Sequence, residues 1–167
     1  MAGEPPALRL EIHDPISTIF CRYGCAKRLI YSYDETQELH PFSYGLLEHA
    51  FSGHLSASVA HRNLLEFLAV ATNPKRVEHP LTPDEALEKI AVYTANLSLI
   101  FPSAKTLLTF TDLFSRHPSI RKRVFDLYLV ATALDNGITQ ICTWNVDHLE
   151  KISELTVKTP EEILTSL

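Results

Sequence analysis

One acidic residue stands in an otherwise apolar segment of the chain. Asp126 follows Val124 and Phe125 and precedes the mainly apolar run from Leu127 to Leu134. The pattern predicts a helix with so little polar surface that neighbouring elements should cover it on most sides. A carboxylate there is costly to desolvate unless a metal ion, a cation or backbone N–H groups partner it. We therefore expect Asp126 to belong to a functional site.

Two further oxygen-bearing side chains follow this helix. Asn136 and Gly137 predict the end of the helix, because glycine readily adopts the left-handed conformation of a helix cap. Residues 138–143 predict a buried strand, and Asn145 and Asp147 come directly after it. Ligands of a parallel α/β sheet bind at the carboxyl ends of its strands. Asp126, Asn145 and Asp147 are thus expected to converge at that edge.

Glu66 is a second acid inside an apolar helix, which we predict over residues 59–72. Leu64, Leu65, Phe67 and Leu68 surround it. One interpretation is a carboxylate at the edge of the buried stripe that reaches an arginine. The other is a functional acid with a perturbed environment.

Strands and helices alternate along the chain, which predicts an α/β fold: a helix–sheet–helix sandwich around a central, mostly parallel sheet. We expect one domain over residues 15–167, after a poorly ordered lead-in over residues 1–14. Thr82 and Thr159 are predicted helix caps, each with a Glu three residues later, and Ser103 is a third predicted cap. The remaining predicted elements are strands 15–21, 54–58, 97–101 and 155–157 and helices 41–52, 83–96, 104–116 and a short one after Thr159.

Composition limits the possible functions. The chain has 167 residues, of which 46% are hydrophobic and 21% charged, enough for one globular domain with a substantial core. No apolar run reaches membrane-spanning length, and the first residues do not resemble a secretory signal. Three cysteines, an odd number without paired spacing, favour free thiols in a reducing cytoplasm.

The formal net charge of −5 disfavours strong non-specific binding of polyanions, but a local basic patch can still serve a nucleic-acid enzyme. Arg121, Lys122 and Arg123 form such a patch just before the helix of Asp126, and Lys75 and Arg76 are further candidates for phosphate contacts. The alternative for the patch is a solvated basic loop, and charge alone does not separate the two.

Several motifs together resemble a known family. Residues 64–74, 81–87, 125–134, 143–149 and 159–162 match, in that order, the PIN-domain family, and most closely its VapC-type toxin ribonucleases. The resemblance covers roughly residues 29–164. It implies a Mg²⁺- or Mn²⁺-dependent endoribonuclease that cleaves RNA in the cytoplasm, binds a cognate antitoxin protein and commonly forms a homodimer.

The resemblance also implies particular metal ligands: Glu66, Asp126, and Asn145 with Asp147 beside it. Such cations prefer several oxygen ligands, and a cation relieves the mutual repulsion of clustered carboxylates. Such an ion can activate water and neutralise charge that develops on the phosphodiester.

The chain departs from the family pattern in two places. Cys25 and Lys27 stand where the family has Asp and Asn in an Asp-x-Asn motif, and neither is a suitable ligand for Mg²⁺. His148 stands where the last acid of the fourth motif is expected. Two explanations remain for the first departure: a rearranged gene start before about residue 28, or a catalytically degenerate PIN domain that binds an antitoxin or another partner.

Overall fold

A computed structural model of the chain describes residues 19–21, 29, 32, 38–117 and 124–167. The predicted lead-in over residues 1–14 and the motif positions Cys25 and Lys27 lie outside these residues. The sheet has five strands: β1 (Ile19–Cys21), β2 (Ala57–Ala60), β3 (Ser98–Ile100), β4 (Gln140–Cys142) and β5 (Thr156–Lys158).

The strand order is β3-β2-β1-β4-β5, and every neighbouring pair is parallel. In the centre of the sheet, Ile19 lies opposite Ala57 on one side and Gln140 on the other. From β1 the chain adds β2 and β3 on one side and β4 and β5 on the other. Ligands of an open α/β sheet bind at such a point of reversal in the strand order. The predicted mostly parallel α/β sandwich is confirmed.

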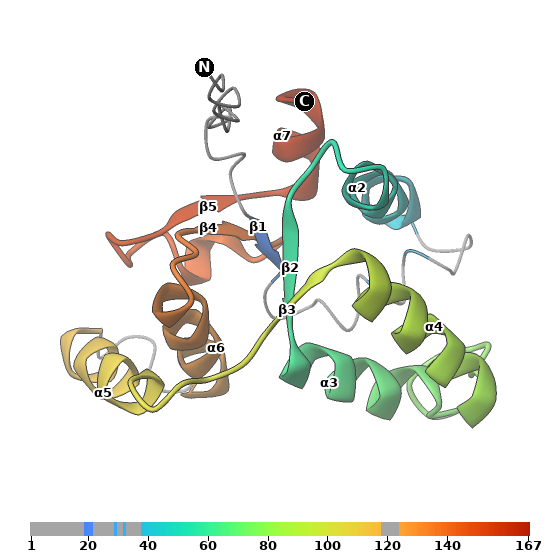
Figure 1. The fold of residues 1–167 in the computed structure, drawn as a ribbon, viewed down its shortest axis with the longest axis horizontal. Coiled ribbons are helices and arrows are strands. Elements are labelled where there is room, and N and C mark those ends of the chain that lie inside the picture. Colours follow the sequence, from blue (N-terminus) through green and yellow to red (C-terminus); the bar gives the residue numbers. More distant parts are fainter. Residues whose placement is uncertain (1–18, 22–28, 30–31, 33–37, 118–123) are drawn as a thin grey trace, which may run out of the picture.

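Six α-helices of the described residues surround this sheet: α2 (His40–Phe51), α3 (His61–Ala71), α4 (Pro83–Asn96), α5 (Thr106–Arg116), α6 (Val124–Asp135) and α7 (Pro160–Thr165). Helices α2 and α7 pack together on one side of the sheet, whereas α5 and α6 pack together on the other (Figure 1). Helices α3 and α4 form a third pair near the β3 edge. Each pair covers an apolar face that a single helix would leave exposed.

Helix α6 is buried on most sides, as its sequence predicts. Residues 129–133 are each no more than 2% exposed, and the apolar ones among them form one core cluster with Leu113 of α5 and Ile141 of β4. The helix ends where predicted: Gly137 has φ +74°, a left-handed conformation that glycine adopts without a steric penalty.

Two predicted boundaries are wrong. Val59 and Ala60, predicted to begin a helix, belong to β2, where they pair with Leu99 and Ile100 of β3; helix α3 begins at His61. Both side chains are 1% exposed, and the sheet register prevails over the local helical pattern.

Ser103 does not cap α5, whose N-cap position is Lys105 and has no side-chain cap. The Ser103 hydroxyl instead accepts a hydrogen bond from the Lys105 N–H over 3.0 Å and donates to Asp135 at the end of α6. Thr106 also donates to Asp135, over 2.9 Å. The turn before α5 therefore anchors this helix to α6.

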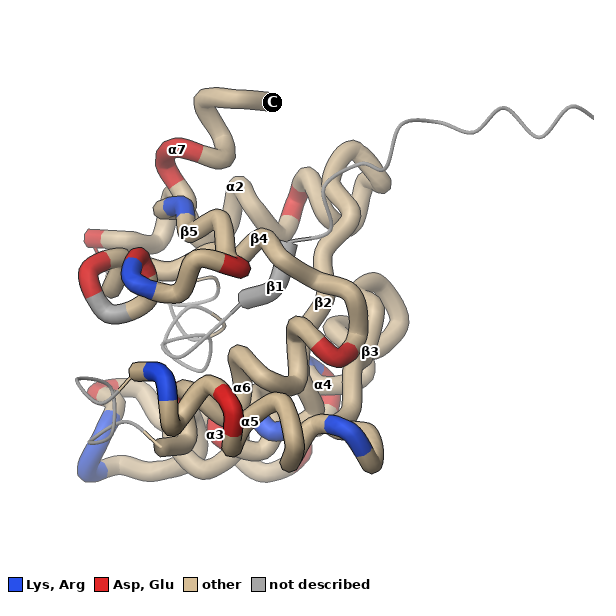
Figure 2. Tube along the Cα trace, turned by 90° about the vertical axis from the view of Figure 1, so that its left-hand side faces the viewer, with Lys and Arg blue, Asp and Glu red and all other residues tan. Residues whose placement is uncertain are grey.

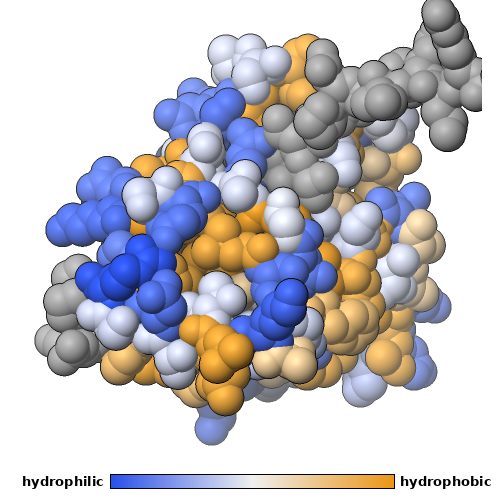
Figure 3. Space-filling model, turned by 60° about the vertical axis from the view of Figure 1, so that its left-hand side comes forward, coloured by the Kyte–Doolittle hydropathy of each residue, from blue (hydrophilic) through white to orange (hydrophobic). Residues whose placement is uncertain are grey.

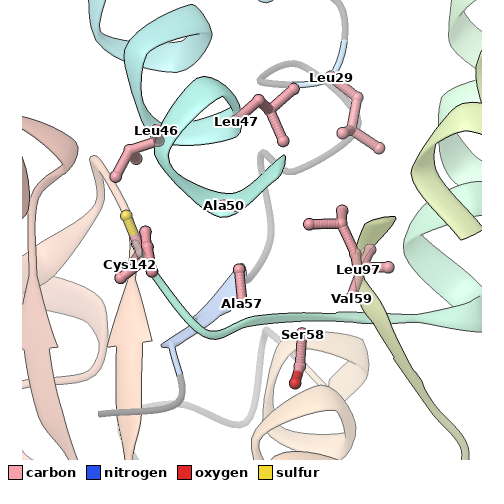
Figure 4. Close-up of a pocket in the computed structure, with 10 residues that line it drawn as sticks. Leu29, Leu46, Leu47, Ala50, Ala57, Ser58, Val59, Leu97 and Cys142 are labelled. Carbon is pink, nitrogen blue, oxygen red and sulfur yellow. The ribbon is translucent and has the colours of Figure 1, made fainter. Parts of the chain in front are cut away.

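A cavity of about 30 Å³ lies between α2 and the sheet (Figure 4). Its walls are almost entirely apolar, and the Ser58 hydroxyl points away from the α2 side chains. The space is large enough for a water molecule but offers it no set of polar partners, so it is a packing gap. The labelled lining residues are Leu29, Leu46, Leu47, Ala50, Ala57, Ser58, Val59, Leu97 and Cys142.

Candidate functional site

Glu66 and Asp126 come from two helices that meet the sheet at the same edge. Helix α3 starts directly at the carboxyl end of β2, and α6 leads from this edge back to the start of β4. Glu66 lies in the second turn of α3, and Asp126 lies in the first turn of α6. Asp126 is only 5% exposed, and Glu66 is half-buried. The fold therefore brings together two acids that are 60 positions apart in the sequence.

Burial is the main cause that raises the pKa of Glu66, and the negative charge of Asp126 raises it further. Arg62 and Arg76 act in the opposite direction, but the pKa stays above its ordinary value of 4.5. The Glu66 Oε2 atom is buried and has no hydrogen-bond partner among the residues that the structure describes. A buried carboxylate oxygen without a partner is a costly arrangement that a bound cation relieves.

The two arginines near Glu66 do not form ion pairs with it in the described part of the chain. The Arg62 guanidinium carbon lies 4.4 Å from the ring centroid of Phe125 in the first turn of α6. Arg76, a predicted phosphate contact, is exposed, and its charge still acts on Glu66. Arg62 and Arg76 thus act on Glu66 through their charge and not through a direct ion pair among the described residues.

Asn63 is a polar residue of this region that the sequence analysis missed. It is 0% exposed, and neither polar atom of its amide has a hydrogen-bond partner within the described ranges. Asn63 precedes Glu66 by three residues, so the two side chains are neighbours on α3. Two signals in the sequence were available for this region. One is an amide inside an otherwise apolar stripe, and the other is the four-residue spacing of Arg62 and Glu66.

Asn145 and Asp147 are exposed on the segment after β4, where Asp147 lies in a 3-10 helix labelled η2 (Val146–His148). The Asn145 N–H donates to the hydroxyl of buried Thr143 over 3.1 Å. No contact given for the described residues joins Asn145 or Asp147 to Glu66 or Asp126. Within the same residues, no three His, Cys, Asp or Glu side chains form a group that could hold a metal ion.

The predicted basic patch Arg121, Lys122 and Arg123 lies outside the described residues, and so does the side chain of His148. In the view of Figure 2, the described Lys and Arg positions are scattered among Asp and Glu positions and form no continuous stripe. On this side of the molecule the described residues therefore form no broad basic surface for polyanions. Among the helices described, none is long and apolar enough to cross a membrane.

An all-parallel five-stranded sheet with paired acids at its carboxyl edge defines a PIN-like α/β fold. The same fold occurs in a chain of the VapBC2 complex from Rickettsia felis, solved with a DNA fragment from its promoter. The TM-score is 0.59 at 16% sequence identity, covering 85% of this chain and 98% of that one. A chain of VapBC-1 from nontypeable Haemophilus influenzae gives 0.59 at 13% identity, covering 86% and 99%.

No protein-family model and no curated protein sequence matches the chain. At these sequence identities the structural likeness establishes the fold alone. The toxin–antitoxin complexes are therefore fold relatives of this chain, and activity has to be argued from its own residues.

Proposed function

We propose that this protein is a metal-dependent endoribonuclease of the PIN/VapC toxin type, with Glu66 and Asp126 as the centre of its site. The observation that supports this most directly is the placement of a buried Asp126 and a half-buried Glu66 at the carboxyl edge of a PIN-like sheet, close enough for the charge of Asp126 to act on Glu66. Structural ion-pair networks also shift pKa values. Here, however, the pKa of Glu66 is raised and its Oε2 atom has no partner among the described residues.

Glu66 and Asp126 offer carboxylate oxygens, the type of ligand that a hard divalent cation such as Mg²⁺ or Mn²⁺ prefers. The oxygen atoms of Glu66 and Asp126 would hold it, and Asn145 and Asp147 are the proposed further ligands from the segment after β4. When bound, such an ion supplies a water nucleophile and neutralises charge on the phosphodiester. The burial of Asp126 excludes water from one side of the site, which strengthens its interaction with a cation.

Positive side chains around the acids have a separate role in this proposal. Arg62 and Arg76 already act electrostatically on Glu66, so an RNA phosphate near the acids would also lie near these guanidinium groups. Arg121, Lys122 and Arg123 are proposed as additional, weaker phosphate contacts, because they immediately precede α6 in the sequence.

A second candidate is a catalytically degenerate PIN domain that binds a partner. The observation that favours it is that no group of three His, Cys, Asp or Glu forms a metal site within the described ranges. Cys25 and Lys27, in place of the family's Asp and Asn, favour it as well. In either case we propose a cognate antitoxin as partner, a homodimer as assembly and the cytoplasm as location. The fold relatives are VapBC complexes, which supports the antitoxin proposal.

Cleavage of RNA by the purified chain, with Mn²⁺ and with EDTA, separates the two candidates. For the nuclease we expect Mn²⁺-dependent products that Asp126→Ala reduces by at least about a hundredfold, the order of effect of removing one preorganised charge-stabilising group. Asp84→Ala is the matched control, since Asp84 also lies in the first turn of a helix but is exposed. Cleavage that persists unchanged in Asp126→Ala refutes the assigned site. No cleavage by the unmodified chain, together with tight antitoxin binding, supports the degenerate domain.

A further inference from the structure

A groove of about 190 Å³ opens between the start of α3, the segment after β3 and α6. In Figure 1 the segment from β3 to α5 runs past the N-terminal end of α3 toward α6, in agreement with this lining. The volume far exceeds the roughly 15 Å³ that one water needs. The groove is lined by Ala60, His61, Arg62, Leu65, Pro102, Tyr128, Leu129 and Thr132.

Two exposed aromatic rings contact the side chains that line this groove. The His61 ring stacks on Phe101 at a centroid distance of 5.2 Å and an interplanar angle of 18°. Arg62 lies over Phe125. Phe101 is 54% exposed and Phe125 is 62% exposed, so both rings keep much of their surface open to solvent. Flat rings and a guanidinium plane are the surfaces on which nucleobases stack.

The side of the molecule formed by α5 and α6 shows no single broad apolar surface. On the face turned forward in Figure 3, which is the side of α5 and α6, apolar patches are interrupted by hydrophilic side chains. Stable protein interfaces instead have a contiguous apolar centre. A single planar group needs only the local apolar surface that this groove provides.

We propose that this groove is a nucleobase subsite, in which one base of a single-stranded RNA stacks against Phe101, Phe125 and the Arg62 guanidinium. The choice of RNA rests on the proposed function. Arg62 lines the groove and acts on Glu66 one turn later in α3, so a base here places the adjoining backbone next to the acids. The subsite would hold the substrate by stacking and leave charge neutralisation to the acid site.

The test measures RNA binding separately from cleavage. The probes are a short, unstructured, fluorescein-labelled single-stranded RNA and an abasic ribose-phosphate oligomer of equal length, with fluorescence anisotropy recorded in EDTA. The variant is Phe101→Leu with Phe125→Leu, which keeps apolar bulk but removes both rings. Tyr44→Leu is the matched control, because Tyr44 is an aromatic of α2 that is 50% exposed.

We expect the unmodified chain to bind the RNA more tightly than the abasic oligomer by on the order of fivefold or more, as one base stack contributes. The double variant should lose this preference, and Tyr44→Leu should retain it. A preference that survives in the double variant, or its absence from the unmodified chain, overturns the subsite. A change of oligomeric state in light scattering, with RNA binding unchanged, also overturns it and assigns the groove to a second copy.

The outcome can be separated from that of the proposed nuclease. Loss of the base preference in the double variant supports the subsite even if the unmodified chain does not cleave RNA with Mn²⁺. The opposite outcome has two parts: Asp126→Ala abolishes Mn²⁺-dependent cleavage, and the double variant keeps the base preference. That result retains the nuclease and rejects the subsite.

Discussion

The acids of α3 and α6 differ in one respect from the acids at the starts of α4 and α7. At α4, the Thr82 N–H donates to Glu85 Oε2 over 2.8 Å, and the Glu85 N–H donates to Thr82 Oγ1 over 3.3 Å. Thr159 and Glu162 form the same capping box at α7, with distances of 2.7 and 3.2 Å. These acids satisfy backbone groups of their own helices.

Glu66 of α3 has the opposite electrostatics. Hydrogen bonds from Thr82, first of all from its backbone, lower the pKa of Glu85. Burial, followed by repulsion from Asp126, raises that of Glu66 despite the nearby arginines. An acid that stabilises the fold is thus already partnered, whereas Glu66 destabilises it until something else binds. This contrast separates the capping acids from the acid at the centre of the proposed site.

The largest effect that tests this contrast is stabilisation by metal. A ligand that binds only the native state at a hundred times its Kd adds about 2.7 kcal/mol to the free energy of unfolding. For a chain of this size, each kcal/mol of added stability raises the Tm by roughly 2–4 °C. We expect Mn²⁺ to raise the Tm of the unmodified chain, but not that of Asp126→Asn, in a thermal melt against EDTA.

Glu85→Gln is the control for this melt, since it alters a capping acid and leaves the acid pair intact. Its melting temperature should start lower and rise with Mn²⁺ as much as that of the unmodified chain. Equal Mn²⁺ responses of the Asp126 variant and the unmodified chain would remove the distinction between the two kinds of acid.

A smaller effect concerns the helix-capping residues alone. Thr82→Ala removes the hydroxyl that accepts the Glu85 N–H and should lower the free energy of unfolding by about 1 kcal/mol, the usual cost of losing such a cap. Urea denaturation followed by circular dichroism measures this change. Thr94→Ala is a suitable comparison, because the Thr94 hydroxyl only bonds back to carbonyls of its own exposed helix turn. An equal loss in both variants would mean that the cap has no special role.

The sequence predicted the capping acids better than the acid pair, and the reason is physical. A capping box depends on residues three positions apart, so Thr82 with Glu85 and Thr159 with Glu162 were identified from spacing and are confirmed. The proximity of Glu66 and Asp126 depends on how β2 and β4 are placed in the sheet. Sequence reasoning reached it only through the resemblance to a family.

Two other contacts could not be predicted from local sequence patterns, because they also depend on the arrangement of distant elements. The Ser103 to Asp135 contact joins residues from the two ends of the α5–α6 pair, so a capping rule misassigned Ser103. The stacking of His61 on Phe101 joins the carboxyl ends of β2 and β3. No local pattern in the sequence predicts this stacking, because only the sheet brings the two rings together.

The smallest expected effect is a difference in the sign of pH dependence. The folded pKa of Glu66 is raised, so native protein binds this proton more tightly than unfolded protein does, and stability falls as pH rises from 4.5 through the folded value. Glu66→Gln removes this loss and should stabilise the metal-free protein at neutral pH. The gain should be below about 1 kcal/mol, because solvent screens a half-exposed carboxylate.

Glu85→Gln should act in the opposite direction. Its folded pKa is lowered, so its stabilisation is present above the unfolded value of 4.5 and is lost as pH falls through the folded value. Melts of both variants and the unmodified chain in EDTA, recorded at closely spaced pH values on both sides of 4.5, measure the two slopes. The contrast requires opposite signs, since one carboxylate is repelled in the native state and the other is hydrogen-bonded there. Slopes of the same sign would show that Glu66 has a stabilising partner, and the argument for a cation at this acid would then fail.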